Sequence, residues 1–401
     1  MKANKDIQFL KSEEVQVFLR ENENMDVHDI SLHPPAWAQG FEKLLADQLI
    51  SRQKARTKLP ELYGRQGILF PPPLSLEQSS SFLTAEYKTR VISGASLVDF
   101  TGGFGVDIMV MSPFFIQTTY VEQNEWLCSL FEQNAKTMGL NARVIQGRAE
   151  EVLNNLKGND HTLYLDPARR DGKNDRVFRF EDCSPDITQL LPQLFSLGKQ
   201  ILVKASPMID LRAAIQSLDK VTEVHVVSVK NEVKEVLFLM TRKTGTIGEP
   251  IIHCVDFPDG QNSISFSFLL SMEGQAETPF ASHLGKMLFI PNASVMKAGA
   301  FKSVAQKFPI QKISANTHLY TADEPLDHFP GRQFEILGEP LSKKDIPRYF
   351  ADHKAHVISR NYPLGANEIK EKYKLTESGD QYLIGFRDAQ QQPVLVAARK
   401  I

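Results

Sequence analysis

Short apolar strands alternate with amphipathic helices between about residues 90 and 245, and few folds accommodate this pattern. SLVDF, TTYVE and LYLD indicate strands, and helical patterns such as NEWLCSLFEQNAKTMG follow them. The strands recur roughly every 20–30 residues, a spacing typical of βαβ units in a parallel sheet. The sequence therefore predicts a doubly wound α/β domain.

The rest of the chain divides into two parts on either side of this pattern. Residues 1–75 predict a helical region and a proline-rich connector, GILFPPPLSLEQ, and residues 76–245 hold the strand–helix pattern. After KTGTIGEP, short strands broken by turns over residues 250–401 predict an α+β domain. A chain of 401 residues is long enough for two or three domains.

Composition favours a cytoplasmic protein. The longest apolar run falls well short of the roughly 20 residues of a membrane span, and the charged N-terminus lacks the apolar core of a signal peptide. Three scattered cysteines (Cys128, Cys183 and Cys254) predict neither a disulfide framework nor structural zinc. A net charge of -2 argues against a generally basic coat for nucleic acid, but not against a local basic patch.

A glycine-rich turn, VDFTGGFGVD, follows the first strand of the pattern. We expect its residues to line a cofactor site: Asp99, Thr101, Gly102, Gly103 and Gly105. A dinucleotide fingerprint would need a third glycine where Ile108 stands, and a diphosphate would not favour Asp99 nearby. S-adenosylmethionine (SAM) carries an ammonium and a sulfonium and has no phosphate, so an acid beside the turn is favourable.

The ends of the next two strands offer further polar groups for SAM. Glu122, followed by Gln123, ends the second strand, where a carboxylate suits the two ribose hydroxyls. Ala149 and Glu150, in GRAEE after the third strand, lie where an adenine amine is expected. The alternative is that these are the glycines and acids that many α/β proteins carry at strand ends. EQSSS could fold over the cofactor, or Ser79 or Ser80 could cap a helix.

These stretches resemble the class I SAM-dependent methyltransferases. VDFTGGFGVD resembles their motif I, and LYLDPARR resembles their motif IV on the fourth strand. GILFPPPLSLEQSSSFLTAEYK, VKASP and FIPNASVMKAGAF further resemble a bacterial group that joins this domain to a C-terminal THUMP-like domain. The resemblance covers most of residues 30–401. It implies a Rossmann-like fold for the SAM domain and RNA as partner, because THUMP domains bind tRNA.

Motif IV of this resemblance implies the catalytic residues Asp166, Pro167 and Arg169. In amino-methylating relatives the motif reads Asp or Asn, Pro, Pro and an aromatic residue, and the acid, which also borders the cofactor, accepts a hydrogen bond from the acceptor amine. Asp166 and Pro167 match, whereas Ala168 and Arg169 depart from the pattern. Arg169, with Arg170 behind it, could stack on a base or hold phosphate, or could pair with neighbouring acids. Lys204 on the same rim could face substrate or only snorkel.

The predicted function is methylation of a nitrogen in a base of structured RNA, either tRNA or rRNA. Carbon methylation is disfavoured because Cys254 lies beyond the last motif. Two basic stretches support RNA: the end of the first long helical segment, and an acid-free stretch between Glu277 and Asp323. The first holds Arg52, Lys54, Arg56 and Lys58, and the second holds Lys286, Lys297, Lys302, Lys307 and Lys312.

Other functions and sites stay open. The chain could be a SAM-binding RNA-interaction protein without turnover, or a methyltransferase acting on a small molecule or protein. We expect no metal site, because His353 and His356 in HKAH lack a third ligand nearby. The sequence does not indicate an oligomeric state.

Overall fold

The structure, a computed structural model, forms two compact units. It describes residues 2–32, 34–169, 179–242, 248–278, 280–342 and 344–401. The N-terminal unit comprises Met1–Thr222 and Glu235–Gly248, and the C-terminal unit comprises Glu223–Lys234 and Glu249–Ile401. The first unit thus takes in the N-terminal helices together with most of the strand–helix pattern.

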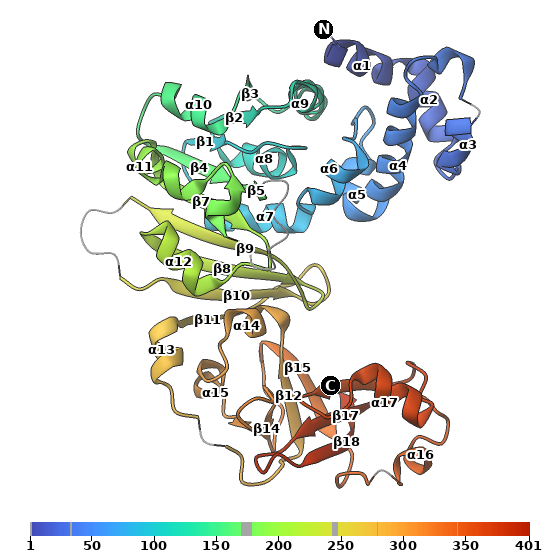
Figure 1. Ribbon diagram of the computed structural model, residues 1–401, viewed down its shortest axis with the longest axis vertical. Coiled ribbons are helices and arrows are strands. Elements are labelled where there is room, and N and C mark those ends of the chain that lie inside the picture. The colour runs from blue at the N-terminus through green and yellow to red at the C-terminus, as the bar shows by residue number, and fades with distance from the viewer. Residues whose placement is uncertain (1, 33, 170–178, 243–247, 279, 343) are drawn as a thin grey trace. The chain divides into compact units, whose positions relative to one another are not determined.

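The N-terminal unit is built on a twisted, mostly parallel sheet (Figure 1). Its strands lie in the order β9-β7-β4-β1-β2-β3, and β9 alone of these runs antiparallel to its neighbour β7. Their bounds are β1 Ser96–Asp99, β2 Gln117–Glu122, β3 Ala142–Gln146, β4 His161–Leu165, β7 Gly198–Ala205 and β9 Glu232–Thr241. β8 (Val221–Val229) starts beside β9, where the Thr222 hydroxyl donates to the Leu239 carbonyl at 3.1 Å.

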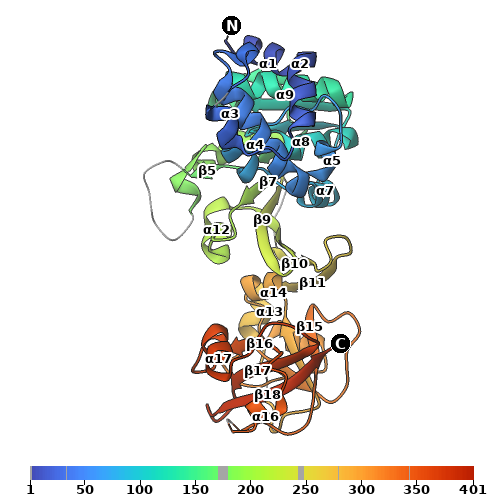
Figure 2. The same cartoon turned by 90° about the vertical axis from the view of Figure 1, so that its right-hand side faces the viewer.

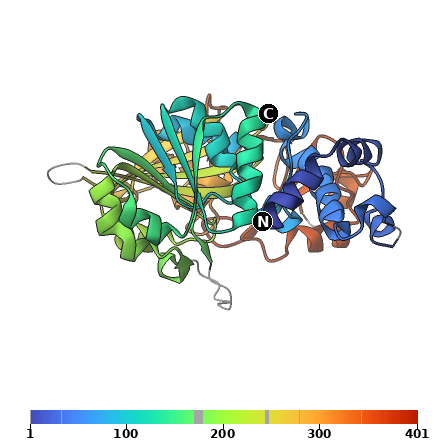
Figure 3. The ribbon, with the colours of Figure 1, turned by 90° about the horizontal axis from the view of Figure 1, so that it is seen from above.

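Helices cover both faces of this sheet (Figure 3). On one face lie α7 Phe82–Val91, α8 Val106–Met111 and α9 Glu125–Met138, and on the other α10 Ala149–Asn155, α11 Ile187–Leu197 and α12 Leu211–Leu218. α9 begins where the Asn124 side chain accepts hydrogen bonds from Trp126 N and Leu127 N, and it ends at Gly139 in the left-handed conformation. The central strands are apolar on both sides because both faces are covered.

Six α-helices precede α7 in the described part of the chain. They are α1 Lys2–Lys11, α2 Glu13–Glu21, α3 Val27–Leu32, α4 Glu42–Lys58, α5 Pro60–Tyr63 and α6 Pro73–Gln78. α1 packs beside α9, and α4 packs beside α2, α3, α5 and α6. Asn134 of α9 holds the connector, because its side chain bonds to both Leu69 N at 2.9 Å and Leu69 O at 2.8 Å.

The C-terminal unit contains a seven-stranded sheet of its own (Figure 2). The strand order is β13-β14-β12-β15-β18-β17-β16, with bounds β12 Met287–Pro291, β13 Gln311–Lys312, β14 Tyr320–Ala322, β15 Gly331–Ile336, β16 His356–Arg360, β17 Gln381–Arg387 and β18 Pro393–Lys400. Ile384 and Val396 face one apolar core, and their neighbours Leu383 and Leu395 face another. α16 Ile346–Tyr349 and α17 Ala366–Tyr373 supply residues to the second core, and α14 Ala293–Ala298 and α15 Ser303–Lys307 lie between β12 and β13 in the chain.

Three more strands of the C-terminal unit lie side by side. β10 (Ile251–Phe257) pairs in parallel with β8 and antiparallel with β11 (Ile264–Leu269), and α13 (Leu270–Gln275) follows. This pairing places residues 223–234 in the C-terminal unit, whereas the sequence pattern groups them with the strand–helix domain.

This architecture confirms the predicted fold class: a doubly wound α/β domain with N-terminal helices, followed by an α+β domain. Among the described residues, every helix is too short or too polar to cross a membrane.

Candidate active site

The strand order reverses next to β1, and polar residues gather at that edge. β1 pairs with β2 on one side and with β4 on the other. In open α/β sheets, ligands bind beyond the carboxyl ends of the strands at this switch point. The four strands β1, β2, β4 and β7 bring Asp99, Glu122, Asp166 and Lys204 to the same edge.

Asp99 lies beneath the glycine turn and fixes its first residue. Its Oδ1 accepts hydrogen bonds from Thr101 N at 2.9 Å and Thr101 Oγ1 at 3.3 Å, and Thr101 Oγ1 in turn accepts from Asp166 N at 2.6 Å. Burial raises the pKa of Asp99 to about 8, and the nearby charges of Asp107 and Asp166 act in the same direction. Asp99 is therefore a much weaker acid than an exposed aspartate.

The glycines let the turn pack closely on two aromatic rings. Tyr120 and Phe131 stack with their centroids 3.9 Å apart, and a side chain on Gly102 or Gly105 would overlap one of them. Gly105 also has a φ of 89°, which disfavours other residues. By contrast, a Cβ on Gly103 would meet only Thr101 O, at 3.8 Å, so Gly103 presents an open backbone face.

Glu122 joins the glycine turn to the end of the second strand. Its Oε2 accepts from Gly103 N at 2.9 Å and its Oε1 from Asn124 N at 2.8 Å. Because a carboxylate can accept about four hydrogen bonds, each oxygen keeps acceptor capacity. Gln123 beside it is exposed.

The residues predicted to meet adenine lie at the start of α10. Gly147 N donates to Glu122 O at 3.0 Å, so the chain enters α10 beside the second strand. Ala149 is buried, and Glu150 lies on the surface, 3.7 Å from Arg148 Nε.

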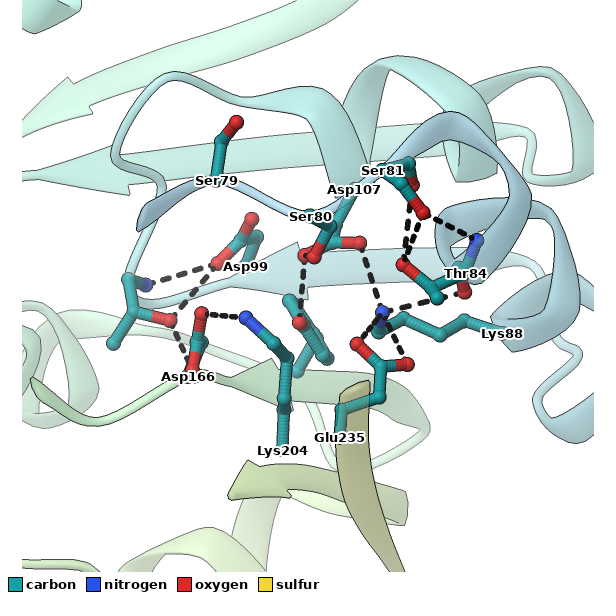
Figure 4. A network of polar contacts seen from close by, with 12 residues as sticks. Ser79, Ser80, Ser81, Thr84, Lys88, Asp99, Asp107, Asp166, Lys204 and Glu235 are labelled. Atoms are coloured by element: carbon teal, nitrogen blue, oxygen red, sulfur yellow. Dashed lines mark hydrogen bonds and ion pairs between the residues drawn. The ribbon is translucent and has the colours of Figure 1, made fainter. Parts of the chain in front are cut away.

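Asp166 ends β4 and is paired with Lys204 (Figure 4). The Lys204 ammonium donates to Asp166 Oδ2, and the Asp166 side chain is still 35% exposed. Burial alone would lower the pKa of Lys204, but the charges of Asp166, Asp107 and Glu235 raise it above its usual range. Lys204 is thus a cation held against Asp166.

The rest of motif IV is only partly described. Pro167 is buried, and Ala168–Arg169 form the short strand β5, which pairs with β6 (Cys183–Ser184). The Arg169 side chain, and the whole of Arg170, lie outside the described residues.

A buried charged network beside the site escaped sequence analysis (Figure 4). Lys88 of α7 lies 2.7 Å from Glu235 Oε1 and 3.1 Å from Asp107 Oδ1, and its side chain is fully buried. Burial would raise the pKa of Asp107, but the charges of Lys88 and Lys204 lower it, helped by hydrogen bonds from Ser80 and Tyr164. In the sequence, Lys88 looks like an ordinary lysine of a helix, so this network could not be predicted from it.

The EQSSS segment lies along the network. Ser80 Oγ donates to Asp107 Oδ2 at 2.7 Å. The proposed helix cap at Ser79 or Ser80 is wrong, because Ser81 caps α7 by accepting from Thr84 N at 3.2 Å. Figure 4 shows Ser80 next to Asp107.

Both basic stretches predicted to meet RNA are partly neutralised or buried. Arg52 pairs with Glu23 at 3.2 Å, and Lys54 pairs with Glu77. Lys312 is buried, and its ammonium donates to Ala315 O at 2.7 Å, so it cannot serve as a phosphate contact. The exposed members of the second stretch include Lys286 and Lys307.

Two half-buried arginines of the C-terminal unit were not indicated by the sequence. Arg332 on β15 and Arg360 on β16 are half-buried. Burial lowers the pKa of Arg332, and the positive charge of Arg360 lowers it further.

Comparison with known proteins gives a match over nearly the whole chain. The solved structure of a "putative methyltransferase" from Porphyromonas gingivalis W83 is 32% identical, with a TM-score of 0.87 over 96% of this chain and 97% of that chain. A sequence family described as a ferredoxin-like domain matches residues 288–330, and one described as THUMP domain-like matches residues 331–400. No curated protein matches the chain.

Other solved structures align with less than half of the chain. An rRNA methylase from Streptococcus thermophilus is 13% identical over 40% of this chain and 95% of its own, with a TM-score of 0.30. The 16S rRNA N2 G1207 methyltransferase of T. thermophilus, in complex with AdoMet and guanosine, is 11% identical over 43% of this chain and 44% of its own, also with a TM-score of 0.30. We draw no conclusion from these partial alignments.

Proposed function

Because the chain belongs to the family that joins a class I methyltransferase domain to a C-terminal THUMP-like domain, we propose that it uses SAM to methylate a nitrogen of a base in structured RNA. The observation that carries this proposal is the linked chain of Asp99, Thr101 and Asp166 across the switch point. These hydrogen bonds connect Asp99, beneath the turn predicted to bind the cofactor, to Asp166, the residue predicted to contact the base that accepts the methyl group.

The polar groups at the switch point fit SAM. The open backbone face of Gly103 leaves room for a ligand, and Glu122 beside it keeps acceptor capacity for the two ribose hydroxyls. Gly102 and Gly105 keep the turn closely packed on the aromatic rings. Ala149 and Glu150 would border the adenine, and exposed Gln123 would lie at the rim.

When bound, SAM supplies an electrophilic methyl group on its sulfonium. Asp166 would orient the acceptor. Lys204 holds its Oδ2, so Oδ1 would accept a hydrogen bond from the N–H of the base and direct the nitrogen lone pair toward the methyl group. The Pro167 carbonyl would accept a second hydrogen bond, and Arg169 would contact the base or a phosphate. The proton lost from the nitrogen would leave through the partly exposed rim.

The C-terminal unit is the proposed RNA-binding part. The THUMP-like match over residues 331–400 contains both Arg332 and Arg360. Their half-buried guanidiniums would contact phosphates or stack on exposed bases. The three cysteines are all buried, which suits the reducing cytoplasm where such RNA is found.

Methyl transfer to RNA tests the proposal. The full-length chain, labelled SAM and total RNA from a strain lacking the gene should give labelled RNA, and nucleoside mass spectrometry should identify an N-methylated base. Asp166→Ala should abolish transfer while SAM affinity stays within a few-fold. Asp160→Ala, which changes an exposed acid just before β4, is the matched control and should keep full activity.

Two observations favour a second function, SAM-dependent RNA binding without turnover. Lys204 occupies one oxygen of Asp166, and Arg169 stands where amino-methylating relatives have an aromatic residue. SAM and RNA binding without any transfer would support that function. Transfer to a small molecule or protein, but not to RNA, would contradict RNA as the substrate.

A further inference from the structure

Two neighbouring strands of the C-terminal unit bring together one glutamate and two histidines. Glu223 and His225 are two residues apart on β8 and so share a face of the strand. β10 pairs with β8 in a register that places His253 opposite His225. Local sequence patterns do not indicate this cluster, because the β8–β9 turn and all of β9 separate His253 from the other two residues.

The distances within the cluster match those around one metal ion. Glu223 Oε2 lies 3.2 Å from His225 Nε2 and 3.4 Å from His253 Nε2, and one ligand atom from each residue lies within 4.8 Å of the others. Ligands at about 2.0–2.2 Å from a tetrahedral zinc ion are roughly 3.3–3.5 Å from one another. Both histidine nitrogens thus lie at the spacing expected for ligands that share an ion with the carboxylate.

The surroundings orient His253 for this role. Its Nδ1 lies 2.8 Å from Ser267 Oγ, and Ser267 is opposite it on β11. Donation from Nδ1 to the serine leaves the lone pair on Nε2 directed at the cluster, as in many metal sites. Among the described residues, His253 Nε2 is buried and makes no hydrogen bond of normal geometry, despite its closeness to Glu223.

The imidazole rings of His225 and His253 are stacked on each other. Their centroids lie 4.6 Å apart with an angle of 18° between the rings. The His225 side chain is 7% exposed and that of His253 is 25% exposed, whereas that of Glu223 is 38% exposed. The cluster is therefore closed toward the sheet and accessible from the glutamate side.

We propose that Glu223, His225 and His253 bind a zinc ion, with a fourth position open to water or another ligand. Two imidazoles and one carboxylate form a ligand set that zinc uses in proteins, and an open position is typical when the protein supplies three ligands. The ion would cross-link β8 to β10. Such a site goes beyond methyl transfer and does not depend on it.

Zinc content of the full-length, untagged chain tests the proposal. After removal of metal, addition of Zn²⁺ and dialysis, mass spectrometry should find one bound ion per chain. Glu223→Gln and His253→Gln should each weaken Zn²⁺ binding in calorimetry by more than about 100-fold, and Ser267→Ala by roughly 10-fold. These partly exposed positions carry the test, since a change at the buried His225 would endanger folding.

Co²⁺ gives a second measurement. The wild-type chain with Co²⁺ should show the visible absorption typical of four-coordinate cobalt, and Glu223→Gln should lose this absorption. His356→Gln is the matched control, because His356 lies 3.6 Å from Glu377 in a surface pair outside this cluster. It should bind Zn²⁺ like the wild type.

Two outcomes would overturn the site. If the wild-type chain retains no more zinc than Glu223→Gln, the cluster is a metal-free group in which both histidines donate to the glutamate. If all variants bind zinc equally, the ion binds elsewhere on the chain.

Discussion

Asp99 and Asp107 are both buried near the switch point, yet their surroundings drive their pKa values in opposite directions. Burial dominates at Asp99, whose partner Thr101 is neutral, and raises its pKa to about 8. At Asp107 burial acts the same way, but Lys88 and Lys204 outweigh it and lower the pKa. Paired cations thus decide which buried carboxyl is ionised at neutral pH.

Asp99→Asn should make stability less sensitive to alkaline pH. The folded-state pKa of Asp99 is raised, so its contribution to stability is fully present below the unfolded-state pKa and is lost as pH rises through about 8. Asparagine imitates the protonated acid and keeps the acceptor for Thr101 N. The melting temperature should therefore fall less between about pH 5 and 9 in the variant than in the wild type.

Asp160→Asn, at an exposed acid, serves as the control and should follow the wild type. An equal fall in melting temperature for Asp99→Asn and the wild type would show that Asp99 is already ionised in the folded protein.

Glu122→Ala should weaken SAM binding at least tenfold. The change removes the proposed ribose acceptors, and each hydrogen bond to a charged group contributes about 1.5–3 kcal/mol. It also leaves Gly103 N and Asn124 N without their carboxylate partner. Calorimetry on Glu122→Ala and on Glu132→Ala, an exposed acid of α9, separates this from a general charge effect. Unchanged affinity in Glu122→Ala would remove Glu122 from the site.

At the scale of secondary structure elements, residues at strand ends could be predicted and the buried network could not. Parallel strands share one carboxyl edge, so Asp99, Glu122 and Asp166 follow from the order of the strands alone. Lys88 and Glu235 are 147 residues apart, and their pairing depends on β9 running antiparallel beside β7. Local patterns carry no information about such a pairing.

The Lys88–Glu235 pair should contribute strongly to stability once formed. Lys88→Met leaves Asp107 and Glu235 as buried acids without their shared cation, which should cost about 3–5 kcal/mol. The double variant Lys88→Met/Glu235→Met should be less destabilised than the sum of the two single variants. Urea unfolding of all four proteins measures this coupling.

The exposed pair Lys54 and Glu77 provides the control for that cycle. It should show no measurable coupling, because solvent screens it. Strictly additive effects at Lys88 and Glu235 would show that the two side chains do not interact in solution.

At the scale of the whole molecule, the chain combines a unit suited to a cofactor with a second unit that matches a THUMP-like family. The overall charge of -2 cannot drive RNA binding. Any affinity for RNA must come from local groups such as Arg332 and Arg360.

RNA binding should therefore weaken steeply with salt, by about 0.7–0.9 in log slope for each phosphate contact. Arg332→Ala and Arg360→Ala should each lower affinity for tRNA or rRNA fragments in filter binding and reduce that slope by about one contact. Arg399→Ala, at an exposed arginine of β18, is the control and should bind RNA like the wild type. A salt-independent affinity, or equal loss in all three variants, would contradict this interface.

The ion pair between Lys88 and Glu235 also has a consequence for biosynthesis. A ribosome releases the glycine turn, Glu122 and Asp166 well before it releases β9, so the nascent chain holds every proposed SAM ligand while Lys88 still lacks one of its two acids. β9 must insert beside β7 before that lysine can be buried with both partners. We therefore expect nascent chains that end before Glu235 to stay sensitive to protease and to depend on chaperones, and the cofactor to bind only late in translation.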